Sequence, residues 1–286
     1  MTKRETRRRS NRPRHLGKVL AFAFVLILAL IWLVPIIMML VVSFMPPDQR
    51  APRFGGLLIS GVSVQNYVTV FEDAEIVKHF INSVAVTIPS VFLVVLISSL
   101  AAFALARLRF LARDIWFYLL IMTLMLPIPT LVVPIFQINK ALGLNDSYLG
   151  LILPYTALGV PFAIVILRSF FANFPIEIEE AARLDGCTRF GIYWRIMMPV
   201  SWPAVAVVII WQFMTSWNEF ILALVTMNSV DVKPLTLVPL VYSGQFMMRP
   251  GPMFAILTLI TLPVIVVYYL MQRFMVSGLT AGAVRG

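Results

Sequence analysis

The sequence contains few of the residues that build catalytic or metal sites. A single cysteine, Cys187, excludes a disulfide within the chain. Two histidines, His15 and His79, argue against a His-ligated metal site or a histidine-based catalytic dyad. No Gly-x-x-x-x-Gly-Lys-Ser/Thr run is present, so a P-loop for nucleotide is absent from the sequence. These absences disfavour an enzyme and predict no cofactor on this chain.

Charge is also scarce, since only 13% of the 286 residues are charged whereas 60% are hydrophobic. Soluble domains average about 45–50% apolar and about 25% charged residues. A soluble globule of this size has too little interior to bury such an apolar excess, and intrinsic disorder requires low hydrophobicity. The composition therefore predicts an integral membrane protein.

Six apolar segments are long enough to cross a membrane, which takes about 20 residues in a helix. Strict alternation over segments of about 10 residues, typical of transmembrane β-strands, is not seen. We expect an all-α integral membrane protein with six transmembrane helices, in a domain of residues 19–275 between tails 1–18 and 276–286. The six predicted spans are residues 19–44, 83–106, 115–138, 148–167, 201–225 and 253–272.

Basic residues are distributed unequally between the two sides that these spans define. Of the 23 Lys and Arg residues, 17 fall on the side of the termini and 6 on the other. Positive residues mark the cytoplasmic face, so we expect both termini in the cytoplasm. The basic tail 1–18 fits a retained anchor attracted to anionic lipid better than a nucleic-acid-binding segment or a cleaved signal peptide. The apolar run that follows it is longer than a signal core.

The segment between the fourth and fifth predicted spans, residues 172–200, does not resemble a simple linker. Asn173 is predicted to cap a helix whose first turns carry three glutamates, where the helix dipole favours negative charge. Gly186 supplies a break, and a second amphipathic stretch, residues 190–197, is predicted to stop at Pro199. We expect a helix–turn–helix outside the membrane.

Residues of fixed type recur at fixed distances in this segment: Glu180, Ala181, Ala182, Gly186, Ile196 and Pro199. The pattern resembles the EAA motif of ABC importer permeases, EAA-x3-G-x9-I-x-L-P, with Met198 in place of the leucine. Segments 107–110, 217–219 and 278–286 look like those of the binding-protein-dependent carbohydrate-uptake family, similar to the MalG-type subunit. The resemblance covers nearly the whole chain outside the tail 1–18.

The resemblance implies a type I ABC importer permease in a bacterial or archaeal plasma (inner) membrane, with no enzymatic chemistry of its own. Implied partners are a second, MalF-like permease subunit, two copies of a cytoplasmic ATPase subunit that bind ATP and Mg, and an extracytoplasmic solute-binding protein that contacts the outer loop 45–78. No nucleic acid is expected. The tail 276–286 resembles a segment that reaches between the ATPase subunits, and its small residues fit an extended insertion.

In such permeases the EAA loop forms coupling helices that dock on the ATPase subunit. Glu180 offers charge to a basic partner group, neighbouring alanines allow close approach, and Gly186 permits the turn. The residues expected to couple to the ATPase subunit are Glu180, Ala181, Ala182, Asp185, Gly186, Ile196 and Pro199.

One acid, Glu219, lies well within a predicted span, where burying a charge is costly and therefore suggests function. At 100° per residue it shares an arc of about 160° with five residues, and Trp217 falls on the opposite side. The five are Trp211, Gln212, Thr215, Ser216 and Asn218. Amides and carboxylates bond sugar hydroxyls, and aromatic faces cover sugar C–H faces. The alternative is that this stripe only packs against neighbouring helices or lies near the outer interface. The candidate substrate-path residues are Trp211, Gln212, Thr215, Asn218 and Glu219.

Other functions remain open at this point. Glycerol-phosphate compounds are alternative solutes, although the absence of basic groups within the predicted spans favours a neutral sugar. The partner permease is an alternative location for the solute site. A secondary transporter would be expected to carry internal repeats and more membrane-embedded ionisable groups. The sequence does not identify the sugar.

Overall fold

Helices account for the regular structure of the chain. The computed structural model describes residues 12–49, 60–73, 75–243 and 249–283, with the side chains of 12–16 and 275–283 outside that description. No β-strand occurs within these residues. The all-α prediction is confirmed.

Four continuous helices are each long and apolar enough to cross a membrane. The last continues for ten residues beyond Arg273, so the expectation of an extended segment after residue 275 is wrong up to Ala283. A helical backbone continues there because no proline follows Pro263 and glycines alone do not stop a helix. The four helices are α1 (Arg12–Ser43), α3 (Ile76–Arg107), α6 (Leu149–Ala172) and α12 (Pro250–Ala283).

Two further predicted spans are broken rather than straight. The span expected at 115–138 is divided into α4 (Arg113–Thr123) and α5 (Ile128–Ala141), which are bent by 101°. Pro127 adopts an extended conformation at the break, where a proline cannot continue the hydrogen-bond ladder. By length and composition the described residues hold four spans, or up to six if each bent pair is one span.

The span expected at 201–225 is also interrupted. It contains α10 (Trp202–Trp217) and α11 (Ile221–Thr226), separated by three residues around Glu219. Before α10 the chain turns by 75° at Ser201. The shorter elements are α2 (Gln65–Asp73), α7 (Ile176–Leu184), α8 (Arg189–Ile192), the π-helical turn η2 (Tyr193–Met197), α9 (Met198–Val200) and the 3-10 helix η3 (Leu235–Tyr242).

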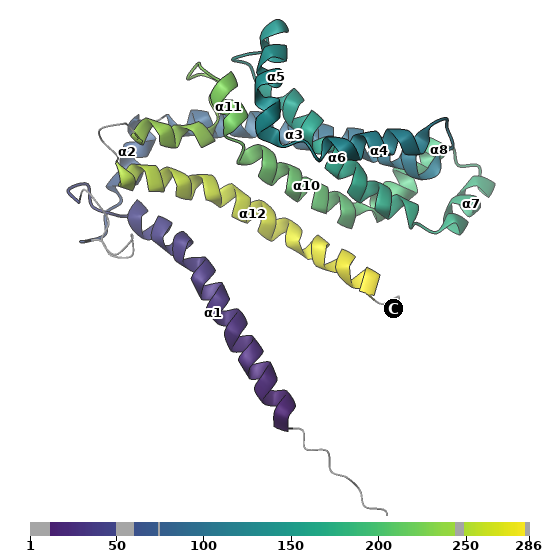
Figure 1. The fold of residues 1–286 in the computed structure, drawn as a ribbon, viewed down its shortest axis with the longest axis horizontal. Helices are drawn as coiled ribbons and strands as arrows, with labels where there is room; N and C mark the ends of the chain where they lie inside the picture. Colours follow the sequence, from purple (N-terminus) through teal and green to yellow (C-terminus); the bar gives the residue numbers. More distant parts are fainter. Residues whose placement is uncertain (1–11, 50–59, 74, 244–248, 284–286) are drawn as a thin grey trace, which may run out of the picture.

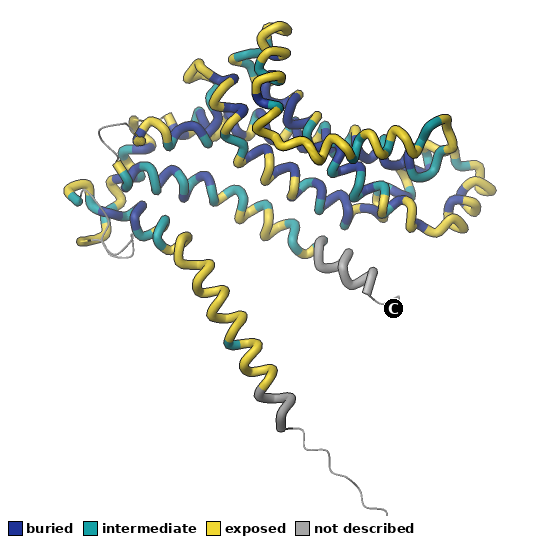
Figure 2. Tube along the Cα trace, in the orientation of Figure 1, coloured by how far each residue is buried: buried dark blue, intermediate teal, exposed yellow. Residues whose placement is uncertain are grey.

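Helices α3 and α6 lie against each other at the centre of the bundle, and α10 lies between them and α12 (Figure 1). A buried cluster near α7 joins α3 and α6 to the segment before α10, through Phe103, Phe171, Tyr193 and Met197. α1 contacts α12 only near its C-terminal end and then diverges from the bundle, so most of its length is exposed (Figure 2). The bundle thus has one compact body and one outlying helix.

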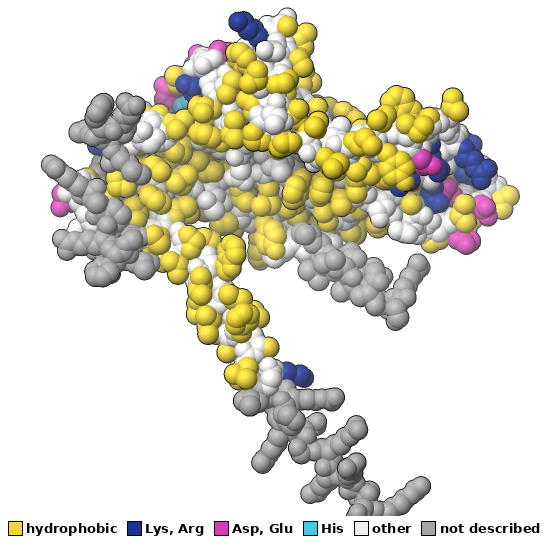
Figure 3. All heavy atoms as spheres, in the orientation of Figure 1, with side chains coloured by type: hydrophobic (Ala, Val, Ile, Leu, Met, Phe, Trp, Pro, Cys, Tyr) yellow, Lys and Arg dark blue, Asp and Glu magenta, His cyan; other side chains and the backbone are white. Residues whose placement is uncertain are grey.

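The surface separates apolar from charged side chains. Apolar side chains cover the flank of the bundle and α1, whereas Lys, Arg, Asp and Glu gather at the end that carries α7 and α8 (Figure 3). Exposed apolar area on this scale marks contact with lipid or with another protein. The helices therefore present an apolar flank between polar ends, as expected of a protein that crosses a membrane.

Candidate functional site

The segment between α6 and α10 forms the predicted helix–turn–helix. α7 begins after Pro175, whose missing N–H costs nothing at a helix start, and Glu177 and Glu179 lie in its first turn. Gly186 has a φ of 80°, a left-handed conformation that glycine adopts without steric cost. Its N–H donates to the Arg183 carbonyl at 3.0 Å, which closes the turn before α8.

Two details of this prediction are wrong. Asn173 does not cap α7, because it is the C-cap residue of α6 and its Nδ2 donates to the Ser169 carbonyl at 2.9 Å. Pro199 does not end the second helix, since the helix continues through α9 to Val200. Proline is tolerated there because it falls within the first turn of α9, directly after the π-helical turn.

The residues predicted to couple to an ATPase subunit divide between the surface and the interior. Glu180, Ala181, Asp185, Gly186 and Pro199 are exposed, and Ile196 is half-buried. Ala182 is buried against the bundle, so only Ala181 of the two alanines is available for close approach by another protein. The coupling role of these residues stays a prediction.

An ion pair that was not predicted from the sequence, between Arg107 and Glu179, holds α7 against α3. Glu179 is 3% exposed, and its Oε1 lies 2.8 Å from Nε of Arg107, although not in hydrogen-bond alignment. The second Oε lies 3.6 Å from Arg183. Glu179 precedes the buried Ala182 by three residues and therefore shares its face of the helix, which was the available signal.

A cavity of about 270 Å³ lies between α6, α10 and the break between α4 and α5. Its wall is mostly apolar, and two of its lining residues, Phe162 and Trp211, stack on each other with ring centroids 4.5 Å apart. The lining residues are Thr123, Leu124, Leu126, Ile128, Val132, Ile135, Tyr155, Leu158, Gly159, Phe162, Trp211, Gln212, Thr215, Ser216, Glu219 and Leu222.

A hydrogen-bond network fixes the polar side of this cavity. Glu219 accepts from the backbone N–H groups of Leu222 at 2.8 Å and Ala223 at 3.1 Å, which start α11. Its Oε2 also accepts from the Tyr155 hydroxyl at 2.8 Å. Gln212 donates from Nε2 to the Tyr155 carbonyl at 3.1 Å. Glu219 therefore caps a helix in the middle of a broken span.

The structure brings together four of the five predicted substrate-path residues, namely Trp211, Gln212, Thr215 and Glu219. Asn218 does not line the cavity, because its exposed side chain donates back to the Met214 carbonyl at 2.8 Å. Tyr155 and Phe162 were missed. Both come from α6, and no sequence pattern connects them to α10. Binding of a solute here stays a prediction.

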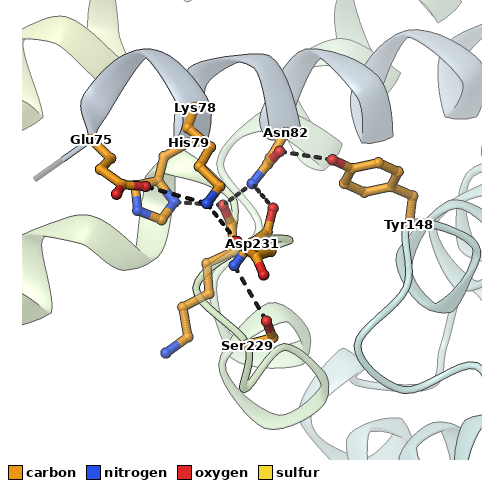
Figure 4. Close-up of polar contacts among 8 residues, drawn as sticks. Glu75, Lys78, His79, Asn82, Tyr148, Ser229 and Asp231 are labelled. Carbon is orange, nitrogen blue, oxygen red and sulfur yellow. Dashed lines mark hydrogen bonds and ion pairs between the residues drawn. The ribbon is translucent and has the colours of Figure 1, made fainter.

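The N-terminal end of α3, opposite to the end that carries Arg107, holds the loop between α11 and η3 (Figure 4). Lys78 pairs with Asp231 and with Glu75, the latter at 3.3 Å. Asn82 donates to the Asp231 carbonyl at 2.9 Å and accepts from the Tyr148 hydroxyl at 2.8 Å. The hydrogen bond and charge of Lys78 hold the pKa of the exposed Asp231 carboxyl below its usual range.

Apolar helices with broken spans around a cavity, and a structured loop at a charged end, define a polytopic membrane permease. Residues 94–280 match the model of the family described as "Binding-protein-dependent transport system inner membrane component". The chain belongs to this family, whose members are transport permeases rather than catalytic subunits.

Three relatives align with this chain along nearly their whole length. The sulfoquinovosyl glycerol transport system permease protein SmoH of Agrobacterium fabrum is 36% identical over 270 residues, covering 94% of this chain and 95% of the relative. The arabinooligosaccharides transport system permease protein AraQ of Bacillus subtilis is 34% identical over 92% and 94% of the two chains. The trehalose transport system permease protein SugB of Mycobacterium tuberculosis is 32% identical over 89% and 93%.

A solved structure shares the fold. It is a chain of a bacterial ABC transporter involved in the import of the acidic polysaccharide alginate, with a TM-score of 0.79 and 22% identity. The match covers 95% of this chain and 99% of that one. The type I ABC permease fold implied by the sequence motif is therefore confirmed.

Proposed function

We propose that this chain is the membrane subunit that moves a sugar, delivered by an external solute-binding protein, through an ABC importer. The observation that carries the proposal is the whole-length similarity to permeases of oligosaccharide, trehalose and sulfoquinovosyl glycerol systems. The cavity supports it, because stacked aromatic rings beside a carboxylate and an amide match the C–H faces and hydroxyls of a sugar. The energy comes from ATP hydrolysed on partner subunits.

The loop of residues 172–200 is proposed to dock on a cytoplasmic ATPase subunit. Its exposed acid Glu180 lies beside the exposed Ala181, which gives a charged and a close-approach position on one short helix. Two copies of that ATPase subunit would bind ATP and Mg, one against this chain and one against a second, MalF-like permease. This assembly has no catalytic residue on the present chain.

The orientation proposed from the basic residues puts both termini and the 172–200 loop in the cytoplasm. Six crossings follow if α4 and α5 form one span and α10 and α11 form another, and an even number of crossings leaves both termini on one side. The loop 227–234 and α2 would then face the solute-binding protein. The charged end in Figure 3 agrees with this assignment, because positive residues gather on the cytoplasmic side.

A neutral sugar is favoured over a glycerol-phosphate compound by the charges of the cavity. Glu219 is its one ionisable carboxylate, and no Lys or Arg occurs among the described lining residues. A phosphate in this cavity would face a like charge without a cation to offset it. The charges of the cavity therefore support a neutral sugar as the solute.

The partner solute-binding protein provides the test of substrate class. Its thermal unfolding midpoint would be measured with trehalose, arabino-oligosaccharides, diacetylchitobiose and glycerol 3-phosphate in turn. A rise with a neutral saccharide, followed by ATP-dependent uptake of the same saccharide into proteoliposomes, supports the proposal. A rise with glycerol 3-phosphate alone would overturn the sugar assignment.

A further inference from the structure

Three residues of α3 form a stripe that faces the loop of residues 172–200. Ser99, Phe103 and Arg107 are four positions apart and therefore lie along one face of the helix. Ser99 is fully buried, Phe103 is 9% exposed, and the Arg107 side chain is 11% exposed. We name these three residues the α3 stripe.

Arg107 binds the loop at two points. Its Nε lies 2.8 Å from Glu179 of α7, and its Nη2 donates to the carbonyl of Phe174, in the connection between α6 and α7. The Glu179 side chain is only 4% exposed, so this is a largely buried ion pair. Separating such a pair is costly because it leaves an uncompensated buried charge. The ion pair therefore resists movement of α7 away from α3.

Ser99 and Phe103 bind the second half of the loop. The Ser99 hydroxyl donates to the Leu96 carbonyl at 3.1 Å, so the Tyr193 hydroxyl is the donor in the 2.8 Å bond between Tyr193 and Ser99. Phe103 packs on the Tyr193 ring with centroids 5.2 Å apart, and on Phe171 at 6.3 Å. Tyr193 belongs to η2, which follows α8.

Both halves of the loop are thus attached to one helix that is distant in sequence. The covalent connections of α7 are short, with Pro175 before it and Gly186 after it. Without the stripe, the contact of α7 with the bundle would rest on apolar packing such as that of the buried Ala182. With the stripe in place, a displacement of α7 or η2 is transferred directly to α3.

We propose that the α3 stripe makes the coupling loop and α3 one rigid unit, with Arg107 and Glu179 as positioning residues. This proposal rests on the proposed function, because the loop needs an ATPase subunit to move it. When ATP binding displaces the loop, α3 is displaced with it. The long helix then carries that movement to its other end, where Lys78 and Asn82 hold the loop between α11 and η3.

Spin-label distances in the assembled importer test the proposal. One label is attached to the native Cys187 and the other to Leu100→Cys on the exposed side of α3, with other cysteines of the complex replaced. Distances are measured without nucleotide and after trapping with ATP, Mg and vanadate. The expected result is the same most probable distance in both states.

Variants then separate the stripe from general stability. Glu179→Gln keeps the shape of the side chain and is expected to shift the distance on trapping, or to broaden its distribution. Arg109→Gln, at an exposed arginine two residues beyond, is the matched control and is expected to behave as the wild type. Should Glu179→Gln not accumulate, Tyr193→Phe removes only the hydroxyl that binds Ser99 and is tested for the same shift.

Two results would overturn the proposal. One is a distance that changes on trapping in the wild type, which would mean that the loop moves independently of α3. The other is a wild-type distribution in both Glu179→Gln and Tyr193→Phe. If the chain forms no ATP-hydrolysing complex at all, the proposed function fails instead, so the two failures are distinguishable.

Discussion

The Tyr155 hydroxyl on α6 donates a 2.8 Å hydrogen bond to the Glu219 carboxylate in the break between α10 and α11. The same carboxylate accepts two backbone N–H groups at the start of α11. One side chain therefore joins the cavity wall, a helix start and a neighbouring helix. These three hydrogen bonds offset the cost of placing an acid at the centre of an apolar segment.

Glu219→Gln is expected to destabilise the chain by about 1–3 kcal/mol, because the amide keeps one acceptor oxygen and adds donors that face existing donors. Tyr155→Phe removes one bond and is expected to cost about 1 kcal/mol. Thermal unfolding in detergent measures both changes. Asn218→Ala, next to Glu219 but outside the cavity, is the control. Unfolding midpoints for Glu219→Gln equal to that of the control would contradict the capping role.

Gly159→Ala is expected to distort the cavity. A Cβ at this position would fall 1.9 Å from Oε1 of Gln212 and 3.0 Å from Cγ2 of Val94. Gln212 would have to leave its bonds to the Tyr155 carbonyl and to Ser216. Overpacking of this kind costs about 1–3 kcal/mol, measured as a lower midpoint of thermal unfolding.

The matched control for that substitution is Gly17→Ala, since no atom lies within 4 Å of a Cβ built on Gly17. It is expected to raise the midpoint slightly, because alanine favours a helix over glycine. Equal midpoints for the two alanine variants would show that Gln212 moves aside without loss of stability. Its hydrogen bonds to Tyr155 and Ser216 would then not stabilise the cavity.

Gly186→Leu and Glu180→Ala are expected to uncouple ATP hydrolysis from uptake for different reasons. Leucine at a φ of 80° costs about 1–2 kcal/mol and distorts the turn. Glu180 is exposed, so its replacement leaves the fold intact and removes only a charge offered to the partner. ATPase activity and uptake are measured together in proteoliposomes. Normal uptake per ATP in Gly186→Leu would refute the coupling role.

Cys187 reports the orientation of the chain. It lies between α7 and α8 and is the single cysteine of the sequence, so no engineering is needed. A membrane-impermeant maleimide is expected to label it in inside-out vesicles and not in intact cells. Leu142→Cys in a Cys187→Ser background is expected to give the reverse pattern. Labelling of Cys187 from outside intact cells would invert the proposed topology.

Much of the fold could be predicted from the sequence because long apolar runs have few alternatives in a membrane. The breaks at Pro127 and around Glu219 could not be located, since prolines also occur inside continuous helices here, as Pro89 and Pro161 do. Whether a proline bends or breaks a helix depends on whether neighbouring helices satisfy the backbone hydrogen-bonding groups that the proline leaves free. Hydropathy does not contain that information.

The candidate site was predictable where one segment carries it and not where two segments meet. Spacing along a single loop predicted the turn at Gly186, whereas the coupling role of Glu180 and Gly186 stays a prediction. The partners Arg107 and Glu179 are 72 positions apart, and the contact depends on how α3 packs against the loop. Glu219 was found as a lone acid, whereas its cap geometry and its bond to Tyr155 required the structure.

ATP-driven uptake by the assembled complex tests the central claim most directly. The chain would be purified with the second permease and the ATPase subunit, reconstituted in liposomes and supplied with the sugar-loaded binding protein. The account predicts that ATP hydrolysis is stimulated by the loaded binding protein and that the sugar accumulates only with ATP and Mg present. Accumulation driven by an ion gradient in liposomes that contain this chain without any ATPase subunit would contradict it.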